Sequence, residues 1–240
     1  MKLFILRFSK LIRIFSNWKF LFAFINHRVL AASEHFNIIN PSLKTIIDIG
    51  ANRGQFALAC IGKVPLVKIH SFEPLQSASD FFEATFTGEK NVKLYKSAIG
   101  EYEKTQLINL SAKDDSSSLL PIGQNQITQF PGTQSIGQIK VNVAPLSKFI
   151  NGNDIESPAM LKIDVQGYEL QVLKGCEDML KYFQWVYCEC SYMELYLGQA
   201  LAPEIISWLY KHNFVLVGVY NSHYDNDGVA IQSDLLFELK

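Results

Sequence analysis

From Leu43 onward, short runs of apolar residues alternate with longer stretches that have the spacing of helices. The first run, Thr45-Ile-Ile-Asp48, leads into a turn that contains two glycines, and helical spacing begins near Gln55. Strands that are separated by helices are joined by crossovers, and this makes neighbouring strands parallel. The alternation therefore predicts an α/β fold with a doubly wound, mostly parallel, Rossmann-like sheet.

Seven runs are expected to form the strands of this sheet: Thr45–Asp48, Val67–Phe72, Asn91–Ala98, Ala159–Asp164, Trp185–Glu189, Phe214–Tyr220 and Asp234–Leu239. The seventh run follows the sixth through a short stretch of turn-forming residues, Asn221–Gly228. Two strands joined so closely pair in opposite directions, so the last strand is predicted to be antiparallel. Helices are expected near Ser77–Phe86, from about Glu169, and at Ala202–His212.

Residues 100–150 interrupt the alternation. They are rich in Ser, Gln, Asn and Gly, with β-like runs at Lys104–Leu110 and Gln138–Val143. A long irregular segment inside a compact domain is more often functional than a linker. We therefore predict one domain over residues 41–240, in which residues 100–150 form an inserted hairpin or lid with a mobile tip.

The N-terminal segment, residues 1–40, has a different composition. Residues 1–33 contain six basic side chains and no acidic one. On a helical wheel Lys2, Arg7, Lys10 and Arg13 share one face, and Phe, Ile, Leu and Trp18 side chains spread over the other. This pattern predicts a basic amphipathic helix, a type that suits the surface of an anionic membrane.

Two other interpretations of this segment are unfavourable. Basic residues recur too often for the apolar core of a signal peptide, and the longest uncharged run, Phe20–Asn26, is too short to span a bilayer. Two expectations therefore stand: peripheral membrane contact through residues 1–33, or packing against the chain's own domain or a second copy in a homo-oligomer. The expected localisation is cytoplasmic, with membrane association under the first expectation. Across the whole chain, 22 basic and 23 acidic residues give a net charge of −1, so no nucleic-acid partner is expected.

The turn after the first strand carries the pattern Asp48-x-Gly50-x-Asn52-x-Gly54. Glycines there allow the backbone to turn tightly and to approach a ligand. The spacing is not that of a dinucleotide-binding fingerprint, and Asp48 would repel a pyrophosphate. S-Adenosylmethionine has no phosphate and carries an ammonium and a sulfonium group, so an acid favours it. Glu73 ends the second strand, where an acid accepts hydrogen bonds from ribose hydroxyls.

Several motifs resemble those of the FkbM-type methyltransferases: Asp48-Ile-Gly-Ala-Asn-Arg-Gly54, Ser71-Phe-Glu-Pro74, Ser97-Ala-Ile-Gly100, Asp234-Leu-Leu-Phe237 and, most specific, Lys162-Ile-Asp-Val-Gln-Gly-Tyr-Glu169. The resemblance covers roughly Leu43 to the last residue. It implies a class I fold with seven strands and O-methylation of sugars or other hydroxylated natural products. It also adds Pro74, Ser97 and Ala98 to the expected cofactor residues. Two positions depart from the family, which often has Asp where Ser147 stands and Glu where Gln166 stands. If either acid contacts substrate or metal in the relatives, that contact is in question in this chain.

Methyl transfer to a hydroxyl needs a positioned nucleophile and a group that removes its proton. Reacting groups in an open α/β sheet belong at the carboxyl ends of the strands. Asp164 ends the fourth strand, Glu189 lies near the end of the fifth, and Glu169 opens the helix after Asp164. Each is a candidate catalytic residue, as a base or as a ligand of a divalent cation. His35 precedes the predicted domain, and His223 is the histidine expected to reach the substrate.

The sequence therefore predicts an S-adenosylmethionine-dependent methyltransferase that modifies a hydroxyl of a sugar, a glycan or a related secondary product. Transfer to a nitrogen or a carboxyl group of another small molecule is the first alternative. The second is a non-catalytic methyltransferase-fold module that binds at a membrane. Dependence on a divalent metal is left open.

Overall fold

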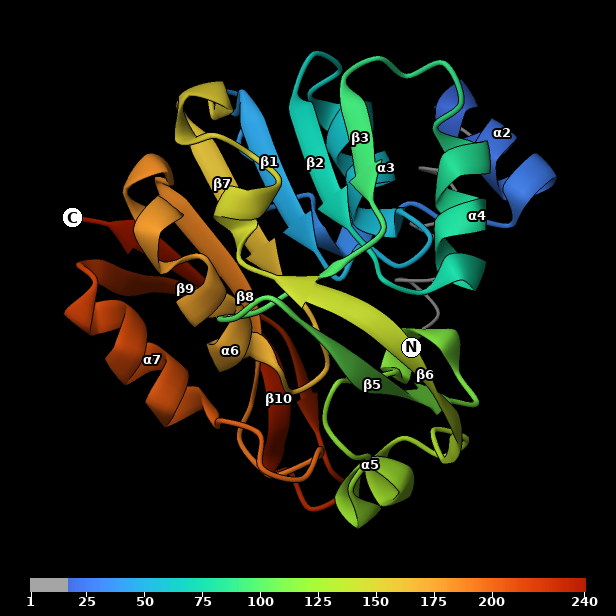
Figure 1. The fold of residues 1–240 in the computed structure, drawn as a ribbon, viewed down its shortest axis with the longest axis vertical. Coiled ribbons are helices and arrows are strands. Elements are labelled where there is room, and N and C mark those ends of the chain that lie inside the picture. The colour runs from blue at the N-terminus through green and yellow to red at the C-terminus, as the bar shows by residue number, and fades with distance from the viewer. Residues whose placement is uncertain (1–16) are drawn as a thin grey trace.

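The computed structural model describes residues 17–240. A seven-stranded sheet runs through the molecule in the order β3-β2-β1-β7-β8-β10-β9 (Figure 1). The strands are β1 (Thr45–Ile49), β2 (Lys68–Phe72), β3 (Val92–Tyr95), β7 (Ala159–Ile163), β8 (Trp185–Ser191), β9 (Phe214–Tyr224) and β10 (Ala230–Leu239). Every pair is parallel except those of β10, which is antiparallel to both β8 and β9. The predicted mostly parallel sheet with an antiparallel last strand is confirmed.

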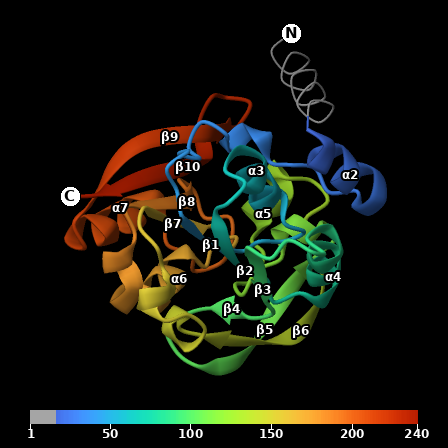
Figure 2. The ribbon, with the colours of Figure 1, turned by 90° about the horizontal axis from the view of Figure 1, so that it is seen from above.

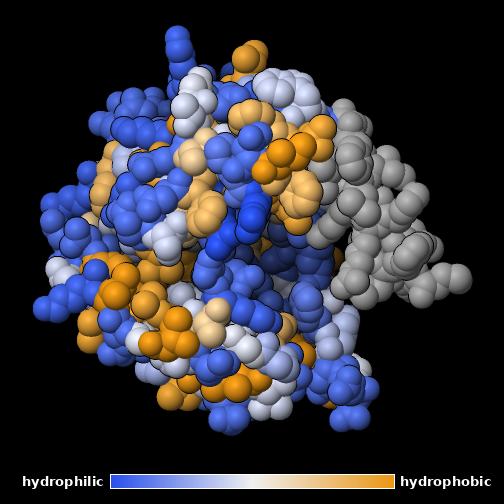
Figure 3. All heavy atoms as spheres, turned by 90° about the vertical axis from the view of Figure 1, so that its right-hand side faces the viewer, coloured by the Kyte–Doolittle hydropathy of each residue, from blue (hydrophilic) through white to orange (hydrophobic). Residues whose placement is uncertain are grey.

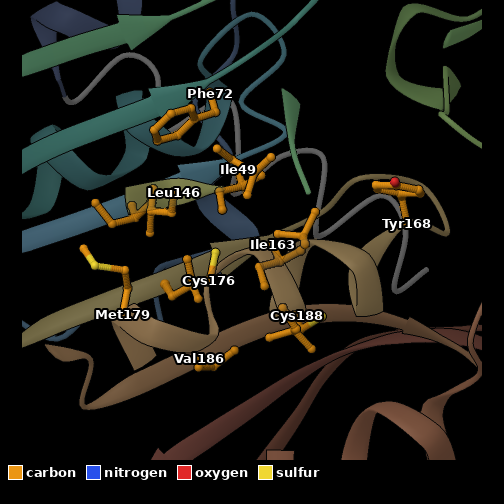
Figure 4. Close-up of a cluster of buried hydrophobic side chains, with 14 of the residues drawn as sticks. Ile49, Phe72, Leu146, Ile163, Tyr168, Cys176, Met179, Val186 and Cys188 are labelled. Carbon is orange, nitrogen blue, oxygen red and sulfur yellow. The ribbon is translucent and has the colours of Figure 1, made fainter. Parts of the chain in front are cut away.

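Helices cover both faces of this sheet (Figure 2). One face packs against α3 (Gln55–Lys63) through Ile46, Met160 and Tyr187. The other packs against α6 (Glu169–Gly175) and α7 (Ala202–Lys211). Figure 4 shows part of this second core, in which Ile163, Val186 and Cys188 lie together. Side chains alternate between the two faces along each strand, so continuous apolar runs such as Thr45–Ile49 contribute side chains to both cores. A fourth helix, α4 (Gln76–Thr85), follows β2.

The segment between β3 and β7 forms a second sheet, in the order β4-β6-β5. It contains β4 (Ala98–Ile99), β5 (Lys104–Ser111) and β6 (Ser135–Ala144), with β5 and β6 antiparallel. A short helix, α5 (Gln124–Gln129), follows β5 and precedes β6 along the chain. In Figure 1 the arrowheads of β1, β2 and β3 point towards this second sheet.

The third predicted strand is two strands in the structure. The expected run Asn91–Ala98 ends as β3 at Tyr95, because the Ser97 N–H bonds back to the Tyr95 carbonyl in a tight turn. The Ser97 hydroxyl then donates to the Asn142 carbonyl, and Ala98 pairs with β6. The chain thus changes sheets at Ser97, which an uninterrupted β-forming pattern does not reveal.

The N-terminal part that the structure describes begins with α2 (Trp18–His27). Phe20 and Ala23 on its inner side are buried in the core around α3. Its outer side exposes Trp18, Phe22 and Ile25, whose exposed fractions are 71%, 51% and 66%. This side faces the viewer in Figure 3, where hydrophobic residues lie beside hydrophilic ones.

Much of the predicted amphipathic helix, residues 1–16, lies outside the described residues. Over residues 17–240, no helix is long and apolar enough to cross a bilayer.

Candidate active site

A cavity lies at the carboxyl ends of β1, β2 and β7, beneath the second sheet. It is lined by six residues that the sequence singled out: Gly50, Asn52, Glu73, Pro74, Ala98 and Asp164. The inserted segment closes it with Ile108, Asp114, Asp115, Ser117, Ser118 and Leu119. We call this the cofactor cavity. Sequence analysis predicted an inserted hairpin or lid over residues 100–150 but singled out none of these six residues, because they carry no motif.

Glu73 is the buried acid of this cavity. Its Oε2 accepts the Asn52 N–H at 2.9 Å, and its Oε1 accepts the Leu75 N–H at 2.8 Å. Burial raises the pKa of Glu73 to about 7, although the two backbone hydrogen bonds lower it. Each carboxylate oxygen keeps a further lone pair, so the side chain is oriented and can accept hydrogen bonds from a diol.

Asp48 does not line the cofactor cavity but lies behind its wall. Its side chain is fully buried, and its Oδ1 lies 3.0 Å from Nζ of Lys162, which also donates to the Gly50 carbonyl. Burial alone would lower the pKa of Lys162, but the Asp48 and Asp164 carboxylates outweigh it and raise that pKa. The Asp48–Lys162 pair therefore links β1 to β7 directly under the glycine turn.

The two glycines of the turn are required by the protein's own packing. Gly50 has φ 77°, and a Cβ there would lie 1.8 Å from the Asp164 carbonyl oxygen. Gly54 has φ 88°, and a Cβ would lie 2.4 Å from the ring of Phe86. Only glycine lets the turn fold this closely onto the end of β7 and onto α4. Neither Gly54 nor Ser97 lines the cofactor cavity.

A second and larger cavity, of about 840 Å³, adjoins the first. We call it the acceptor cleft. It shares Asp115, Asp164 and Gln166 with the cofactor cavity. Its other walls come from the N-terminal segment, the insertion and the strands β8, β9 and β10: Glu34, His35, Lys113, Ser116, Gln126, Phe130, Thr133, Glu189, Asn221, Ser222, His223, Gln232 and Asp234.

Gln166 joins two of the candidate catalytic acids at this junction. Its Nε2 donates to Asp164 Oδ1 at 2.8 Å and to Glu189 Oε2 at 3.0 Å. Its Oε1 accepts the hydroxyl of Tyr196 at 2.8 Å. Burial raises the pKa of Glu189, and the charge of Asp164 raises it further. The amide of Gln166 thus bridges two carboxyl groups that would otherwise repel each other.

Glu169, the third candidate, lines neither cavity. Its Oε1 accepts the N–H groups of Val165 and Gly167, so the carboxyl group holds the turn between β7 and α6. Burial raises the pKa of Glu169 to about 7. Through these contacts Glu169 stabilises the turn that follows Asp164.

Three cleft residues, His35, Asn221 and Asp234, form a cluster with the buried Tyr187 that sequence analysis did not assemble. Asp234 Oδ2 accepts the Tyr187 hydroxyl at 2.9 Å and Nδ2 of Asn221 at 2.8 Å. His35 Nδ1 lies 2.9 Å from the same hydroxyl and 3.7 Å from Asp234 Oδ2. Because His35 precedes the predicted domain, its position in the sequence does not point to this cleft. His223, which the sequence favoured, also lines the cleft.

The residues that line the cofactor cavity match the functional groups of S-adenosylmethionine. The Asn52 Oδ1 atom is buried and has no hydrogen-bond partner among the described residues, so it is free to accept from an ammonium or a hydroxyl group. Glu73 offers the diol acceptor, and Pro74, Leu75 and Ile99 supply apolar walls for a base. Within residues 17–240, no group of three or more His, Cys, Asp or Glu residues is placed to hold a metal ion.

Comparisons with known proteins agree with this assignment. Residues 48–216 match the family model described as the methyltransferase FkbM domain. The 2-O-methyltransferase NoeI of Sinorhizobium fredii is 26% identical over 170 residues, which cover 68% of this chain and 70% of that protein. Methyltransferase sdnD of Sordaria araneosa is 27% identical over 206 residues, 75% of this chain and 77% of that protein.

A solved structure shows the same fold. The crystal structure of methyltransferase FkbM from Methylobacillus flagellatus has a TM-score of 0.53 and 13% identity over 87% of this chain. This chain spans about half (49%) of the length of that one. The sheet is therefore that of a class I methyltransferase, and the family implies S-adenosylmethionine as the methyl donor. On the match to its family model, this chain belongs to the FkbM methyltransferase family.

Proposed function

We propose that this protein transfers a methyl group from S-adenosylmethionine to a hydroxyl group of a sugar, a glycan or a related secondary product. The observation that carries the proposal is the junction of the two cavities at Asp164 and Gln166. A methyl donor in the first cavity and an acceptor in the second would meet there. The relative NoeI is named a 2-O-methyltransferase, which supports a hydroxyl acceptor.

The chain's own residues would hold both reactants. Glu73 and Asn52 bind and orient the methyl donor, which supplies a methyl group already activated on a sulfonium. Asp164, like Asp115, lines both cavities, and its side chain is 39% exposed. Gln166 binds its Oδ1, so the carboxyl group has a fixed orientation towards an acceptor hydroxyl. Fixing the hydroxyl in line with the methyl group supplies much of the rate.

The walls of the acceptor cleft also bear on the alternatives. Five acids line it (Glu34, Asp115, Asp164, Glu189 and Asp234), against one lysine, Lys113, although burial raises the pKa of Glu189 and of Asp234 and so weakens their share of the negative charge. An anionic acceptor is disfavoured by this field, so transfer to a carboxyl group is the weaker alternative. An amine acceptor is the second candidate, because the same field attracts a cation.

The test has two steps. Isothermal titration of the full chain with S-adenosylmethionine is expected to show one site, whereas a non-catalytic module that has lost the cofactor would show none. The chain is then incubated with labelled donor and a panel of methyl glycosides, aminosugars and sugar acids. Methyl ethers on the glycosides are the expected product, and mass spectrometry identifies the methylated position. Labelled methylamines would favour the amine candidate, and methyl esters alone would overturn the proposal.

A further inference from the structure

His35 is held in the acceptor cleft by contacts on several sides. It ends a short 3-10 turn, Ser33–His35, that packs against α3. Its ring meets the edges of Phe56 and Tyr187, with ring centres 5.5 Å and 5.6 Å away. The side chain is only 18% exposed. These contacts fix the plane of the imidazole, so its two nitrogens have different surroundings.

Nδ1 faces a chain of hydrogen bonds that sets the tautomer. The Tyr187 hydroxyl has one hydrogen, and the carboxylate of Asp234, 2.9 Å away, is its stronger acceptor. The hydroxyl oxygen is then left to accept from Nδ1 of His35 at 2.9 Å, an arrangement that favours a hydrogen on Nδ1. The Asn221 amide is directed to the same carboxylate at 2.8 Å and lies farther, 3.3 Å, from Nδ1.

Nε2 therefore carries the lone pair. Among the described residues, the structure gives this nitrogen no hydrogen-bond partner, and His35 lines the cleft that Asp164 also lines. A neutral imidazole whose Nδ1–H is fixed by a carboxylate, directly or through a hydroxyl, is the arrangement of a general base.

We propose that His35 is the catalytic base of methyl transfer, and that Tyr187 and Asp234 are its positioning residues; this rests on the proposed function. The proton of the acceptor hydroxyl passes to Nε2 while the oxygen forms its bond to the methyl carbon. The carbon–sulfur bond breaks with both electrons on sulfur, which leaves a neutral thioether. Asp234 stabilises the imidazolium through Tyr187, and the proton is lost to water when product leaves. Asp164 then orients the hydroxyl instead of deprotonating it.

The surroundings of His35 keep the base neutral. Burial against Phe56 lowers its pKa, and Lys162 on β7 acts in the same direction. Asp234 on β10, Glu34 on the same turn and Asp164 after β7 oppose this but do not outweigh it. The imidazole is therefore unprotonated near pH 7 and able to accept a proton.

The first test needs no acceptor. In protein labelled with ¹⁵N, long-range ¹H–¹⁵N correlation spectra report which ring nitrogen of His35 carries the hydrogen. The expected result is the Nδ1–H form in the wild-type chain and a mixture of tautomers in Tyr187→Phe and Asp234→Asn. A wild-type Nε2–H form would overturn the assignment of the base while leaving the proposed function intact.

The second test uses whichever methyl glycoside the wild-type chain methylates fastest. His35→Ala is expected to lower kcat by at least about 100-fold without changing the dissociation constant of S-adenosylmethionine, and added imidazole is expected to restore part of the rate. Tyr187→Phe is expected to move the acidic limb of the kcat/KM profile to lower pH. Full activity of His35→Ala would overturn the proposal.

The matched control is His70→Gln. His70 Nδ1 lies 3.2 Å from the Tyr95 hydroxyl, so it resembles His35 in its partner, but it lines neither cavity. Its kcat is expected to equal that of the wild-type chain, and imidazole is expected to have no effect on it. If the wild-type chain fails to bind S-adenosylmethionine, the proposed function is overturned instead. The titration described above measures this binding independently of the His35 variants.

Discussion

At the scale of single residues, this site depends on carboxyl groups whose neighbours assign them different tasks. Glu73 is oriented by two backbone N–H groups, Asp164 by an amide, and Glu169 is occupied by the turn it holds. Sequence position made all three candidates, because strand ends converge at one edge of a parallel sheet. Position in the sequence does not distinguish a carboxyl group that faces a cavity from one that caps a turn, because the difference lies in the direction of the side chain.

Asp164→Asn tests the task of the acid at the junction. The asparagine Oδ1 can still accept from Gln166, so the turn is expected to keep its shape while the charge is lost. We expect kcat to fall by about 10²-fold, with the affinity for S-adenosylmethionine and the thermal midpoint close to wild-type values. Steady-state kinetics and titration of the same preparation check this. A variant that loses donor binding instead would make Asp164 a cofactor anchor.

Glu73 links donor binding to pH. Its pKa is about 7 in the free protein, and hydrogen bonds from a ribose diol favour the ionised carboxylate, so binding is expected to release a proton. The affinity for S-adenosylmethionine should therefore rise between pH 6 and pH 8, by up to about 10-fold. Titration across this range measures it. Glu73→Gln should bind more weakly, with a flat pH dependence; an unchanged slope would assign the proton to another group.

At the scale of elements, the sequence predicted the strands and helices of the main sheet better than it predicted the insertion. Buried strands such as β1 and β7 are continuous apolar runs between turns, and few structures besides a buried parallel strand produce this pattern. In the insertion, β6 is mostly exposed over residues 135–140, and the change of sheets at Ser97 depends on a hydrogen bond to Asn142. Such long-range backbone pairing leaves no local trace in the sequence.

The two sides of α2 give a matched pair of substitutions. Phe20 is 3% exposed and packs in the core around α3, whereas Phe22 is 51% exposed. Phe20→Ala is expected to lower the free energy of unfolding by about 3–4 kcal/mol, because it removes buried surface and leaves a cavity. Phe22→Ala is expected to change it by less than about 0.5 kcal/mol. Denaturant unfolding of both variants measures the difference. Equal losses would mean that the outer side of α2 is also covered in solution.

At the scale of the whole molecule, the acceptor cleft joins segments that are distant in the chain. His35 lies before the first strand, Tyr187 on β8, Asn221 on β9 and Asp234 on β10. Each of these residues taken alone is an ordinary polar side chain. Only the strand order, which puts β10 between β8 and β9, brings them together. The fold could therefore be predicted from periodicity, and the cofactor turn from its motif, while this cluster required the topology.

The buried acids also set how the stability of the free protein depends on pH. Glu73 and Glu169 have pKa values of about 7 in the folded state, above the usual 4.5, so the folded protein retains protons that the unfolded chain has lost. Their stabilising effect is complete below about pH 4.5 and is lost as the pH rises through 7. The lowered pKa of His35 acts in the opposite direction. We expect the free energy of unfolding to be lower at pH 8 than at pH 5.5 by about 2 kcal/mol.

Urea unfolding at a series of pH values checks this expectation. Glu169→Gln is expected to flatten the profile, since one of the buried carboxyl groups with a raised pKa is then absent. Stability that rises steadily from pH 5.5 to pH 8 would show that the two carboxyl groups are ionised in the folded protein.

The position of β10 bears on how the chain matures during synthesis. Until β10 has left the ribosome, the edge of β8 that it will cover is unpaired, and an exposed strand edge of this kind recruits other chains. β10 also brings Asp234 to Tyr187 and His35. The pairing of β10 with β8 therefore covers the exposed strand edge and completes the hydrogen-bond chain at the same time.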